Sequence, residues 1–467
     1  MSLVTKVSTK IGPGYLIRNT KFIYFAQLTN NLMNYSNTLD FLFSSLPMYQ
    51  RIGKAAYKSD LKTTIRLDNY FGNPHRSFKT VHIAGTNGKG SVSHMLASVM
   101  QAAGYKTGLY TSPHFTDFRE RIRVNGIPID KKYIIDFVES NRDIIKELEP
   151  SFFEMTVALA FLYFQKKNVD IAVIETGMGG RLDSTNVITP ELSVITNISF
   201  DHTQYLGDTL GKIATEKAGI IKHRVPVVIG RANKEVREVF ITKAREMNSD
   251  IYFAEDLYSL EKSGKDSDGN KQVFNVYMDD HIVIEKLSTD LLGDYQSYNI
   301  ITVLQVVHLL QKNWKINSES LRNGLDNVKG NTGFTGRWQI MQKSPLVICD
   351  AGHNYDGLLL SVSQLKKMGG NKIHIVLGVV NDKDIDSMLG VLPGSAKYYF
   401  TRAGIPRAMD EKILEGKASF YNLKGHSYRT VREAYDAAMA NAGSDDIIFI
   451  SGSSFVVADF LEYFSSE

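Results

Sequence analysis

Cysteine is nearly missing from this chain of 467 residues, in which Cys349 is the single example. One cysteine excludes an internal disulfide framework and favours a reducing compartment, so we expect a cytoplasmic protein. Long apolar stretches are missing as well, since no run approaches the roughly 18 residues that a membrane-spanning helix needs. The sequence therefore predicts a protein without a membrane partner.

A charge excess of one sign is also lacking. The chain has 54 basic and 50 acidic residues, which gives a net charge of +4. This balance gives no reason to expect a nucleic-acid partner. A hydrophobic content of 43% with 22% charged residues is typical of a globular protein. The length predicts two or three domains, each large enough to bury its own core.

Acidic residues are absent from the first 39 positions, which hold Lys6, Lys10, Arg18 and Lys21. This bias is one feature of a transit segment. The alternative is a non-native or loosely ordered leader, because the aromatic residues of this stretch do not form a clean apolar face. We assign residues 1–34 to such a leader.

Short β-branched runs alternate with helix-like stretches from Lys79 onward. A strand is predicted at 80–84, a helix at 91–103 and a strand at 107–111, and further strands are predicted at 170–175, 193–197 and 225–229. This alternation is typical of an α/β fold with a mostly parallel sheet. Polar, Gly-rich sequence at 261–270 interrupts the rhythm, and 271–286 predicts an antiparallel hairpin at the sheet edge.

A second alternating series starts near Pro345, so the sequence predicts two α/β domains. We place the first at 35–330, a linker at 331–337, and a smaller, Rossmann-like C-terminal domain at 338–467.

A glycine-rich loop follows the first strand and precedes the first helix. It consists of Gly85, Thr86, Asn87, Gly88, Lys89, Gly90 and Ser91. Glycines let successive backbone N–H groups face an anion, and a helix N-terminus adds about half a positive charge. Lys89 can then reach terminal phosphates, and the Ser91 hydroxyl can meet Mg²⁺. The alternative is an ordinary turn that caps a helix. The ordered strand, loop, Lys and helix favour a P-loop-type, ATP-binding first domain.

This loop and several later segments together resemble the folate branch of the Mur-ligase superfamily, whose members are folylpolyglutamate and dihydrofolate synthases. The later segments are Thr111-Ser112-Pro113-His114, the run from Glu175 to Asp183, Asp201-His202, Glu216-Lys217-Ala218-Gly219 and the run from Asp350 to Asn354. The resemblance implies an ATP-dependent ligase that joins L-glutamate to a pteroate or folate, and it implies a monomer.

A metal site is the second expectation. Ser112, Glu175 and His202 each follow or end a predicted strand, and loops at strand carboxyl ends converge on one crevice in an open α/β sheet. Oxygen and imidazole donors suit Mg²⁺ or Mn²⁺. Taken singly, Ser112 fits a turn and His202 a structural histidine. The resemblance implies one or two Mg²⁺ ions in the site, and it implies that Ser112, Glu175 and His202 bind the same ion.

Lys217 lies in a predicted helix, where a surface lysine paired with an acid is the simplest interpretation. The resemblance instead implies a lysine carbamylated by CO₂, whose new carboxylate-like group would bind a second Mg²⁺.

Five residues are expected around the nucleotide and the incoming amine. The resemblance implies that Gln296 and Asn299 contact the nucleotide, although a helix-capping pair is the alternative and Tyr295 stands where the family commonly has His. Arg337 is expected to clamp a phosphate. Asp350 is expected to contact the nucleotide or to deprotonate the amine, and His353 to act in catalysis with Lys89, His202 and Lys217. A ribose or helix-cap role for Asp350 and a structural role for His353 remain open.

Three weaker candidates follow. The run 382–384 reads as solvated charges, Arg407 could contact an acidic substrate, and Phe153 could stack on a pterin or lie in the core.

The expected reaction begins with attack of a substrate carboxylate on the γ-phosphate of ATP. The acyl phosphate that results would then react with the amino group of glutamate. A Mur-type cell-wall ligase is the nearest alternative, but only about 80 residues precede the phosphate loop, which leaves little room for an N-terminal nucleotide-sugar domain. A nucleotide-binding module without ligase chemistry would need neither Lys217, Asp350 nor His353.

Overall fold

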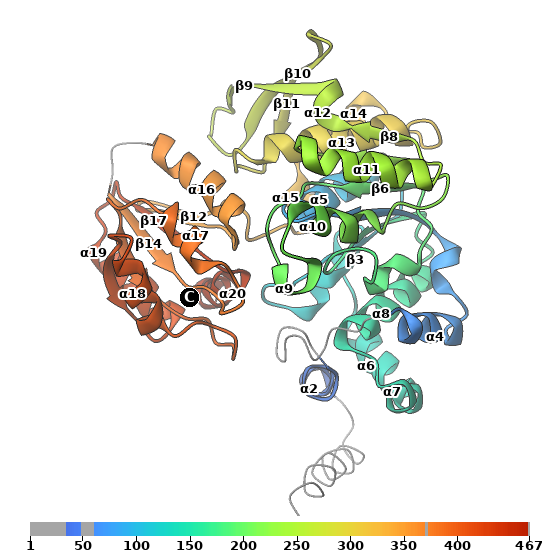
Figure 1. The fold of residues 1–467 in the computed structure, drawn as a ribbon, viewed down its shortest axis with the longest axis horizontal. Coiled ribbons are helices and arrows are strands. Elements are labelled where there is room, and N and C mark those ends of the chain that lie inside the picture. The colour runs from blue at the N-terminus through green and yellow to red at the C-terminus, as the bar shows by residue number, and fades with distance from the viewer. Residues whose placement is uncertain (1–33, 48–59, 369–371, 466–467) are drawn as a thin grey trace, which may run out of the picture.

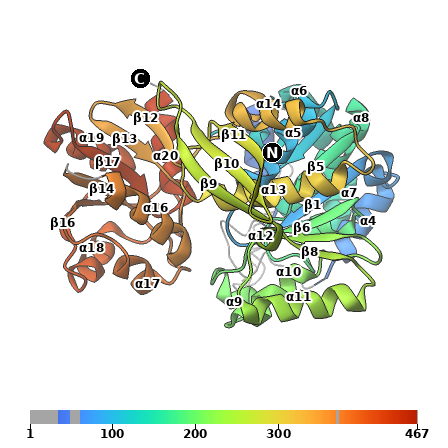
Figure 2. The same cartoon turned by 90° about the horizontal axis from the view of Figure 1, so that it is seen from above.

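The structure of the chain is a computed structural model that describes residues 34–47, 60–368 and 372–465. The predicted leader lies outside these ranges except for Asn34, which caps helix α2 (Tyr35–Ser45). A large N-terminal body and a smaller C-terminal domain lie side by side (Figure 1, Figure 2).

An eight-stranded sheet forms the centre of the N-terminal body, in the order β4-β3-β2-β5-β1-β6-β7-β8. Its strands are β1 (Lys79–Ala84), β2 (Thr107–Tyr110), β3 (Ile122–Val124), β4 (Ile127–Pro128), β5 (Ile171–Glu175), β6 (Leu192–Ile195), β7 (Val227–Ile229) and β8 (Ile251–Phe253). Among the described strands of this sheet, the antiparallel pairs are those that β3 forms with β2 and with β4. Every residue of β5 is buried, as expected for an apolar strand covered on both faces. The predicted mostly parallel sheet is confirmed.

Helices cover both faces of this sheet. They are α4 (Lys62–Tyr70), α5 (Lys89–Ala102), α6 (Lys131–Ser140), α7 (Arg142–Leu148), α8 (Phe152–Lys167), α9 (Thr203–Leu206), α10 (Leu210–Ala218), α11 (Lys234–Glu246), α12 (Ala254–Leu257), α13 (Gln296–Leu310), α14 (Ser318–Asp326) and α15 (Val328–Thr332), with 3₁₀ turns η2 (Pro74–Ser77), η3 (Phe118–Arg121) and η4 (Ser184–Val187). Helices α5, α13 and α14 share one core with Val81 and Val173 of the sheet. Helix α8 packs on the other face, against Ala172 and Ile174.

A separate antiparallel sheet follows, made of β9 (Tyr258–Lys265), β10 (Gln272–Met278) and β11 (His281–Thr289) (Figure 1). The expected hairpin is therefore present as β10 and β11. Strand β9 was not predicted, because its residues from Glu261 onward are exposed and polar and carry no alternating pattern. These strands form their own sheet and do not extend the main one.

The C-terminal domain has a six-stranded sheet in the order β12-β13-β17-β14-β15-β16. The strands are β12 (Gln339–Lys343), β13 (Leu346–Cys349), β14 (Ile373–Leu377), β15 (Lys397–Phe400), β16 (Lys424–Ser427) and β17 (Ile447–Ser451), and only β12 is antiparallel. The helices are α16 (Tyr355–Met368), α17 (Ile385–Gly390), α18 (Glu411–Ser419), α19 (Val431–Asn441) and α20 (Ser454–Ser465). The expected second α/β domain is present.

The segment between the two sheets begins inside α15, whose last residue is Thr332. It ends at Trp338, which is 2% exposed and has a φ of 43°. The linker proposed at 331–337 thus begins in a helix and ends beside a buried side chain.

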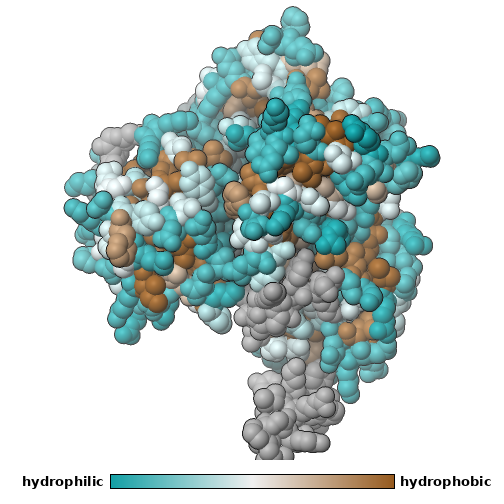
Figure 3. Space-filling view, in the orientation of Figure 1, coloured by the Kyte–Doolittle hydropathy of each residue, from teal (hydrophilic) through white to brown (hydrophobic). Residues whose placement is uncertain are grey.

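None of the described helices is long and apolar enough to cross a bilayer. Figure 3 shows a face on which apolar residues form small groups between hydrophilic ones.

Two buried histidines give an expected pH dependence of stability. His82 and His94 each accept from or donate to one threonine hydroxyl at 2.8 Å, and burial lowers the pKa of both from 6.5 to about 3. Below pH 6.5 the unfolded chain binds protons that the folded chain does not. Stability should therefore be full above about pH 6.5 and fall as the pH drops toward 3, by up to about 1.4 kcal/mol per pH unit for each histidine.

Urea unfolding at several pH values between 7 and 4.5 measures this slope. The substitution His82→Gln removes one titrating group, so the slope should become shallower even if the variant is less stable at pH 7. Equal slopes for the two proteins would contradict the prediction.

Candidate active site

One cavity of about 340 Å³ lies where the carboxyl ends of the N-terminal strands face the C-terminal domain. Almost all residues predicted for the site line it: Gly85, Thr86, Asn87, Gly88, Lys89, Gly90, Ser91, Ser112, Glu175, His202, Lys217, Asn299, Arg337, Asp350 and His353. Gln296 is the exception, because it is fully buried and does not line the cavity. Residues far apart in the sequence are thus brought together, as the strand-end argument predicts.

The phosphate loop has the backbone that its glycines allow. Gly85 and Gly88 have φ values of 144° and 86°, and a side chain at Gly88 would overlap Asn299. Lys89 begins helix α5, and its Nζ donates to the carbonyl oxygens of Gly85 and Thr86 at 3.1 and 3.2 Å. The loop therefore presents an ammonium group and a helix N-terminus to the cavity.

A second ammonium group meets the same carbonyl. Lys217 Nζ donates to the Gly85 oxygen at 2.8 Å, and the side chain is buried. Burial and the neighbouring Lys89 lower the pKa of Lys217 to about 7. Its amine is therefore neutral in a substantial fraction of molecules near pH 7. The simple interpretation of Lys217 as a surface lysine is wrong.

Glu175 is a buried carboxylate beside the phosphate loop. Burial raises its pKa to about 7, although Lys89 opposes the shift, and the Ser112 N–H donates a hydrogen bond to Oε2 at 3.1 Å. A Cβ on Gly90 would lie 3.9 Å from both Glu175 oxygens. A cation at this position would restore the ionised form of the carboxylate.

The residues at Glu175 fit a Mg²⁺ ion by their chemistry. His202 supplies an imidazole that burial keeps neutral, with its pKa lowered to about 3, and Ser112 supplies a hydroxyl. Neutral imidazole and oxygen donors are ligand types for such ions. Within the described ranges, no three His, Cys, Asp or Glu side chains are placed to hold one metal. Any ion here would therefore depend on the serine, the phosphates or a modified Lys217.

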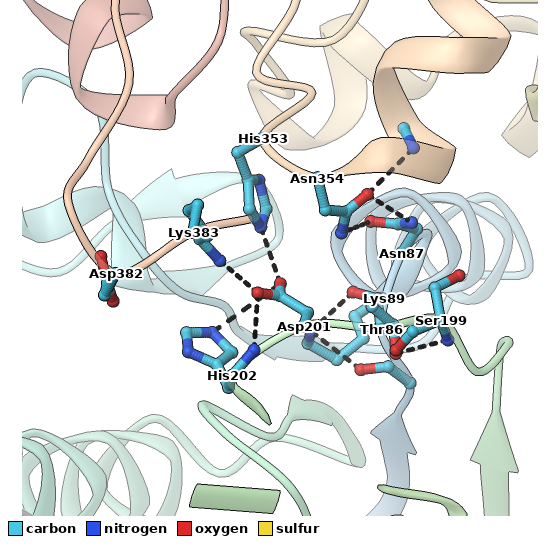
Figure 4. Close-up of polar contacts among 12 residues, drawn as sticks. Thr86, Asn87, Lys89, Ser199, Asp201, His202, His353, Asn354, Asp382 and Lys383 are labelled. Carbon is cyan, nitrogen blue, oxygen red and sulfur yellow. Dashed lines mark hydrogen bonds and ion pairs between the residues drawn. The ribbon is translucent and has the colours of Figure 1, made fainter. Parts of the chain in front are cut away.

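Asp201 joins the two domains through its carboxylate (Figure 4). Its Oδ2 lies 3.1 Å from His353 Nε2, and its Oδ1 forms an ion pair with Lys383. Burial alone would raise the pKa of Asp201, but His202, Lys383 and His353 together hold it well below its usual value. The side chains of His202, Lys383 and His353 thus all favour the ionised form of the Asp201 carboxyl group.

Lys383 corrects the sequence interpretation of 382–384 as solvated charges. Its side chain is only 8% exposed. Asp382 pairs with Arg407 at 2.9 Å, and Asp384 caps helix α17. The position of this run directly after a strand was the available signal.

A pair of amides makes a second link between the domains (Figure 4). Asn87 Nδ2 donates to Asn354 Oδ1 at 3.2 Å, and Asn354 Nδ2 donates to Asn87 Oδ1 at 3.0 Å. Because Asn87 belongs to the phosphate loop, the C-terminal domain directly contacts that loop.

Asp350 is held by four donors. Its Oδ2 accepts from the Tyr295 hydroxyl at 2.5 Å and the Trp338 N–H at 2.8 Å, and its Oδ1 accepts from the Gly352 N–H at 2.8 Å and the Ser361 hydroxyl at 3.3 Å. These bonds tie the start of α13 to the segment between the domains. They leave the carboxylate better placed to orient its neighbours than to accept a proton.

Of the residues predicted to contact the nucleotide, Asn299 and Arg337 line the cavity and Gln296 lies behind Asn299. Asn299 lies over Gly88 and donates to Gln296 Oε1 at 2.7 Å, so Gln296 orients it from behind. Arg337 lines the cavity, and its buried Nη1 has no hydrogen-bond partner among the described residues. Such a donor suits a phosphate oxygen.

The lining of the cavity also has an apolar, aromatic part, beside which lies one residue that the sequence did not reveal. Phe152, Phe153 and Met178 belong to this part, and Gly177 packs directly under the Phe153 ring. Arg121 lies beside them. It had no motif of its own, and only its burial in the folded chain singles it out.

Family comparisons agree with this geometry. The Mur ligase middle domain matches residues 83–307, and the Mur ligase glutamate ligase domain matches residues 336–454. Fold, cavity and matches together define an ATP-dependent ligase of the Mur type.

Individual relatives narrow the family further. The folylpolyglutamate synthase of Lacticaseibacillus casei is 32% identical over 437 residues, which cover 91% of this chain and 97% of the relative. The dihydrofolate synthase/folylpolyglutamate synthase of Bacillus subtilis is 33% identical, covering 83% of this chain and 91% of the relative. The chain belongs to the folylpolyglutamate synthase and dihydrofolate synthase family.

Other relatives are longer. The chain spans 50% of a Haloferax volcanii relative that is 33% identical and described as a probable bifunctional folylpolyglutamate synthase/dihydropteroate synthase.

Solved structures show the same fold. A Mycobacterium tuberculosis folylpolyglutamate synthase complexed with ADP has a TM-score of 0.82 at 29% identity, covering 93% of this chain and 98% of the other. An Escherichia coli FolC in complex with DHPP and ADP has a TM-score of 0.79 at 26% identity, covering 93% and 98%.

Proposed function

We infer that this enzyme uses ATP to join L-glutamate to the carboxylate of dihydropteroate, to the γ-carboxylate of folates, or to both. One observation carries this inference. One cavity between the two domains is lined both by the phosphate loop with Lys89 and by Phe152 and Phe153. A triphosphate and an aromatic acceptor can therefore bind in the same cavity.

The main obstacle to the reaction is charge repulsion. A carboxylate oxygen and a phosphate oxygen at 4 Å repel by about 1 kcal/mol in water and by about 4 kcal/mol at an effective dielectric of 20. Lys89, Arg337 and the loop N–H groups offset this repulsion at the phosphates. Ser91, Ser112, Glu175 and His202 would hold one Mg²⁺, which adds positive charge beside the same oxygens when bound.

In the first step the acceptor carboxylate oxygen bonds to the γ-phosphorus, and the bond from that phosphorus to the β–γ bridging oxygen breaks to release ADP. In the second step the amino nitrogen of glutamate bonds to the acyl carbon and inorganic phosphate leaves. The amine must lose a proton. Asp350 holds four hydrogen bonds, and both ring nitrogens of His353 contact acceptors, the Ala351 oxygen at 3.0 Å and Asp201 Oδ2 at 3.1 Å. We therefore assign His353 to orienting the amine, whose proton leaves to solvent or to the departing phosphate.

The C-terminal domain contributes by excluding water from the acyl phosphate. Its contacts to the phosphate loop through Asn354 and to Asp201 through Lys383 place it over the cavity. We assign the linker at 331–337 to the hinge of this closure, the enzyme to the cytoplasm and its working state to the monomer.

Carbamylation of Lys217 belongs to the same proposal. A buried amine with a pKa near 7 has the neutral form that reacts with CO₂, and the product would be a ligand beside His202. Carbon-13 NMR of protein equilibrated with labelled bicarbonate should show one carbamate signal that disappears in Lys217→Gln. Spectra without any such signal would refute the modification.

Turnover tests the function directly. Purified protein with Mg-ATP and L-glutamate should release ADP only when dihydropteroate or tetrahydrofolate is added, in separate reactions. Release with both acceptors establishes a bifunctional enzyme, and release with one identifies its step. Folded protein that binds ADP but turns over neither acceptor would overturn the proposal.

A further inference from the structure

Arg121 is a buried cation that forms no ion pair with any of the described residues. It ends the 3₁₀ turn η3 and is 3% exposed. Its Nε donates to His114 Nδ1 at 2.7 Å, and its guanidinium carbon lies 5.3 Å from the centroid of the Phe152 ring. No carboxylate of the described ranges forms an ion pair with it.

The carboxylates of Glu120 and Glu175 attract the Arg121 guanidinium, but neither forms an ion pair with it in the described ranges. The Glu120 carboxylate accepts from the backbone N–H groups of Phe115, Thr116 and Asp117 at 2.8, 3.0 and 2.9 Å. Asp117 pairs with Arg119 at 2.8 Å. His114 supplies no negative charge, because it is an imidazole that accepts the Arg121 hydrogen bond through Nδ1.

A buried charge without a counter-ion is costly, so proteins pair such groups or expose them to a ligand. Burial lowers the pKa of Arg121, but an arginine stays protonated in proteins. Arg121, which has no ion pair with a described residue, lines the cavity of about 340 Å³ between the domains. An anionic ligand is therefore the expected partner.

The place of Arg121 in the cavity indicates which anion this is. Arg121 lines the same cavity as the phosphate loop, and its guanidinium carbon lies 5.3 Å from the centroid of the Phe152 ring. A ligand whose aromatic body packs on the phenylalanines could therefore place a terminal carboxylate at Arg121, inside the cavity that the phosphate loop lines. The planar guanidinium fork matches a carboxylate.

We propose that Arg121 binds the carboxylate of the acceptor substrate and orients its oxygen toward the γ-phosphate. This assignment rests on the proposed function and names a substrate-binding residue for it. Arg121 neither gives nor takes a proton. The bond that forms joins the carboxylate oxygen to phosphorus, the bond that breaks releases ADP, and the guanidinium stays beside the acyl group throughout.

The test compares two probes that differ only in charge, pteroate and its carboxamide, binding to the full chain saturated with ADP. Because a hydrogen bond to a charged group is at stake, the native enzyme should prefer pteroate by about tenfold to a hundredfold. Arg121→Gln should bind the two probes equally, with unchanged affinity for the carboxamide. Calorimetry gives both constants.

A matched control is available on the same turn. Arg119 is partly exposed and already paired with Asp117, so Arg119→Gln should keep the native preference for pteroate. ADP affinity reports whether the variants are folded, and Arg121→Lys, which retains a charge, should keep part of the preference if the Gln variant does not fold.

Several outcomes would overturn the assignment. An Arg121→Gln protein that still prefers pteroate would do so. So would one that loses ADP affinity while keeping that preference, because the guanidinium would then serve the nucleotide phosphates. A native enzyme that binds ADP but neither probe would instead refute the proposed function itself.

Discussion

Lys89→Gln is expected to lower turnover by about a hundredfold to a thousandfold, because one preorganised charge at the transferring phosphate is removed. The Lys89 ammonium lies between the Gly85 and Thr86 carbonyls, at the start of the helix that faces the cavity. Its charge should count most when negative charge crowds around the γ-phosphorus. Steady-state ADP release at saturating substrates measures the effect as a change in kcat.

Lys79→Gln is the control for this substitution. Lys79 begins the strand that leads to the phosphate loop, but it lies at the other end of the sheet with a side chain that is 63% exposed. Its replacement should leave kcat unchanged. A Lys89→Gln enzyme that matches this control would show that the loop does not stabilise phosphoryl transfer.

Lys383→Met should open the two domains. The substitution leaves the Asp201 carboxylate buried with one partner lost, and breaking a buried ion pair in this way costs about 3 to 5 kcal/mol. Asp201 can escape this cost only by reaching water, which requires the C-terminal domain to move away. We expect an increased radius of gyration in X-ray scattering and a large loss of turnover.

Lys367→Met provides the comparison. Lys367 also bridges the domains, through Asp294 at 3.4 Å, but its side chain is 72% exposed. Exposed ion pairs contribute little, so this variant should scatter and turn over like the native enzyme. Identical behaviour of the two variants would contradict a closing role for Lys383.

The sequence was most informative where consecutive residues determine the local backbone conformation or the burial of a strand. The glycines at 85 and 88 predicted a loop whose φ values are indeed positive, and the apolar runs predicted buried parallel strands. Strand β9 escaped because an exposed strand carries no apolar alternation. The roles of the site residues remain predictions.

Contacts between the domains could not be predicted in the same way. Asp201 and Lys383 are 182 positions apart, and no sequence pattern around either residue predicts their contact. The same limit hid Arg121, because its significance is the absence of an ion pair with any of the described residues around it. A sequence shows which charges exist, but only packing shows which of them remain uncompensated.

Cys349 ends strand β13 with no exposed surface and no disulfide partner in the described chain. Burial raises the pKa of its thiol, so little thiolate is present near neutral pH and thiol reagents should react with it slowly. Because the native cysteine reacts slowly, a cysteine introduced at the surface can be labelled selectively. A surface cysteine introduced on each domain could carry fluorescent dyes without removal of the native one, and distances between the dyes would follow domain closure in real time.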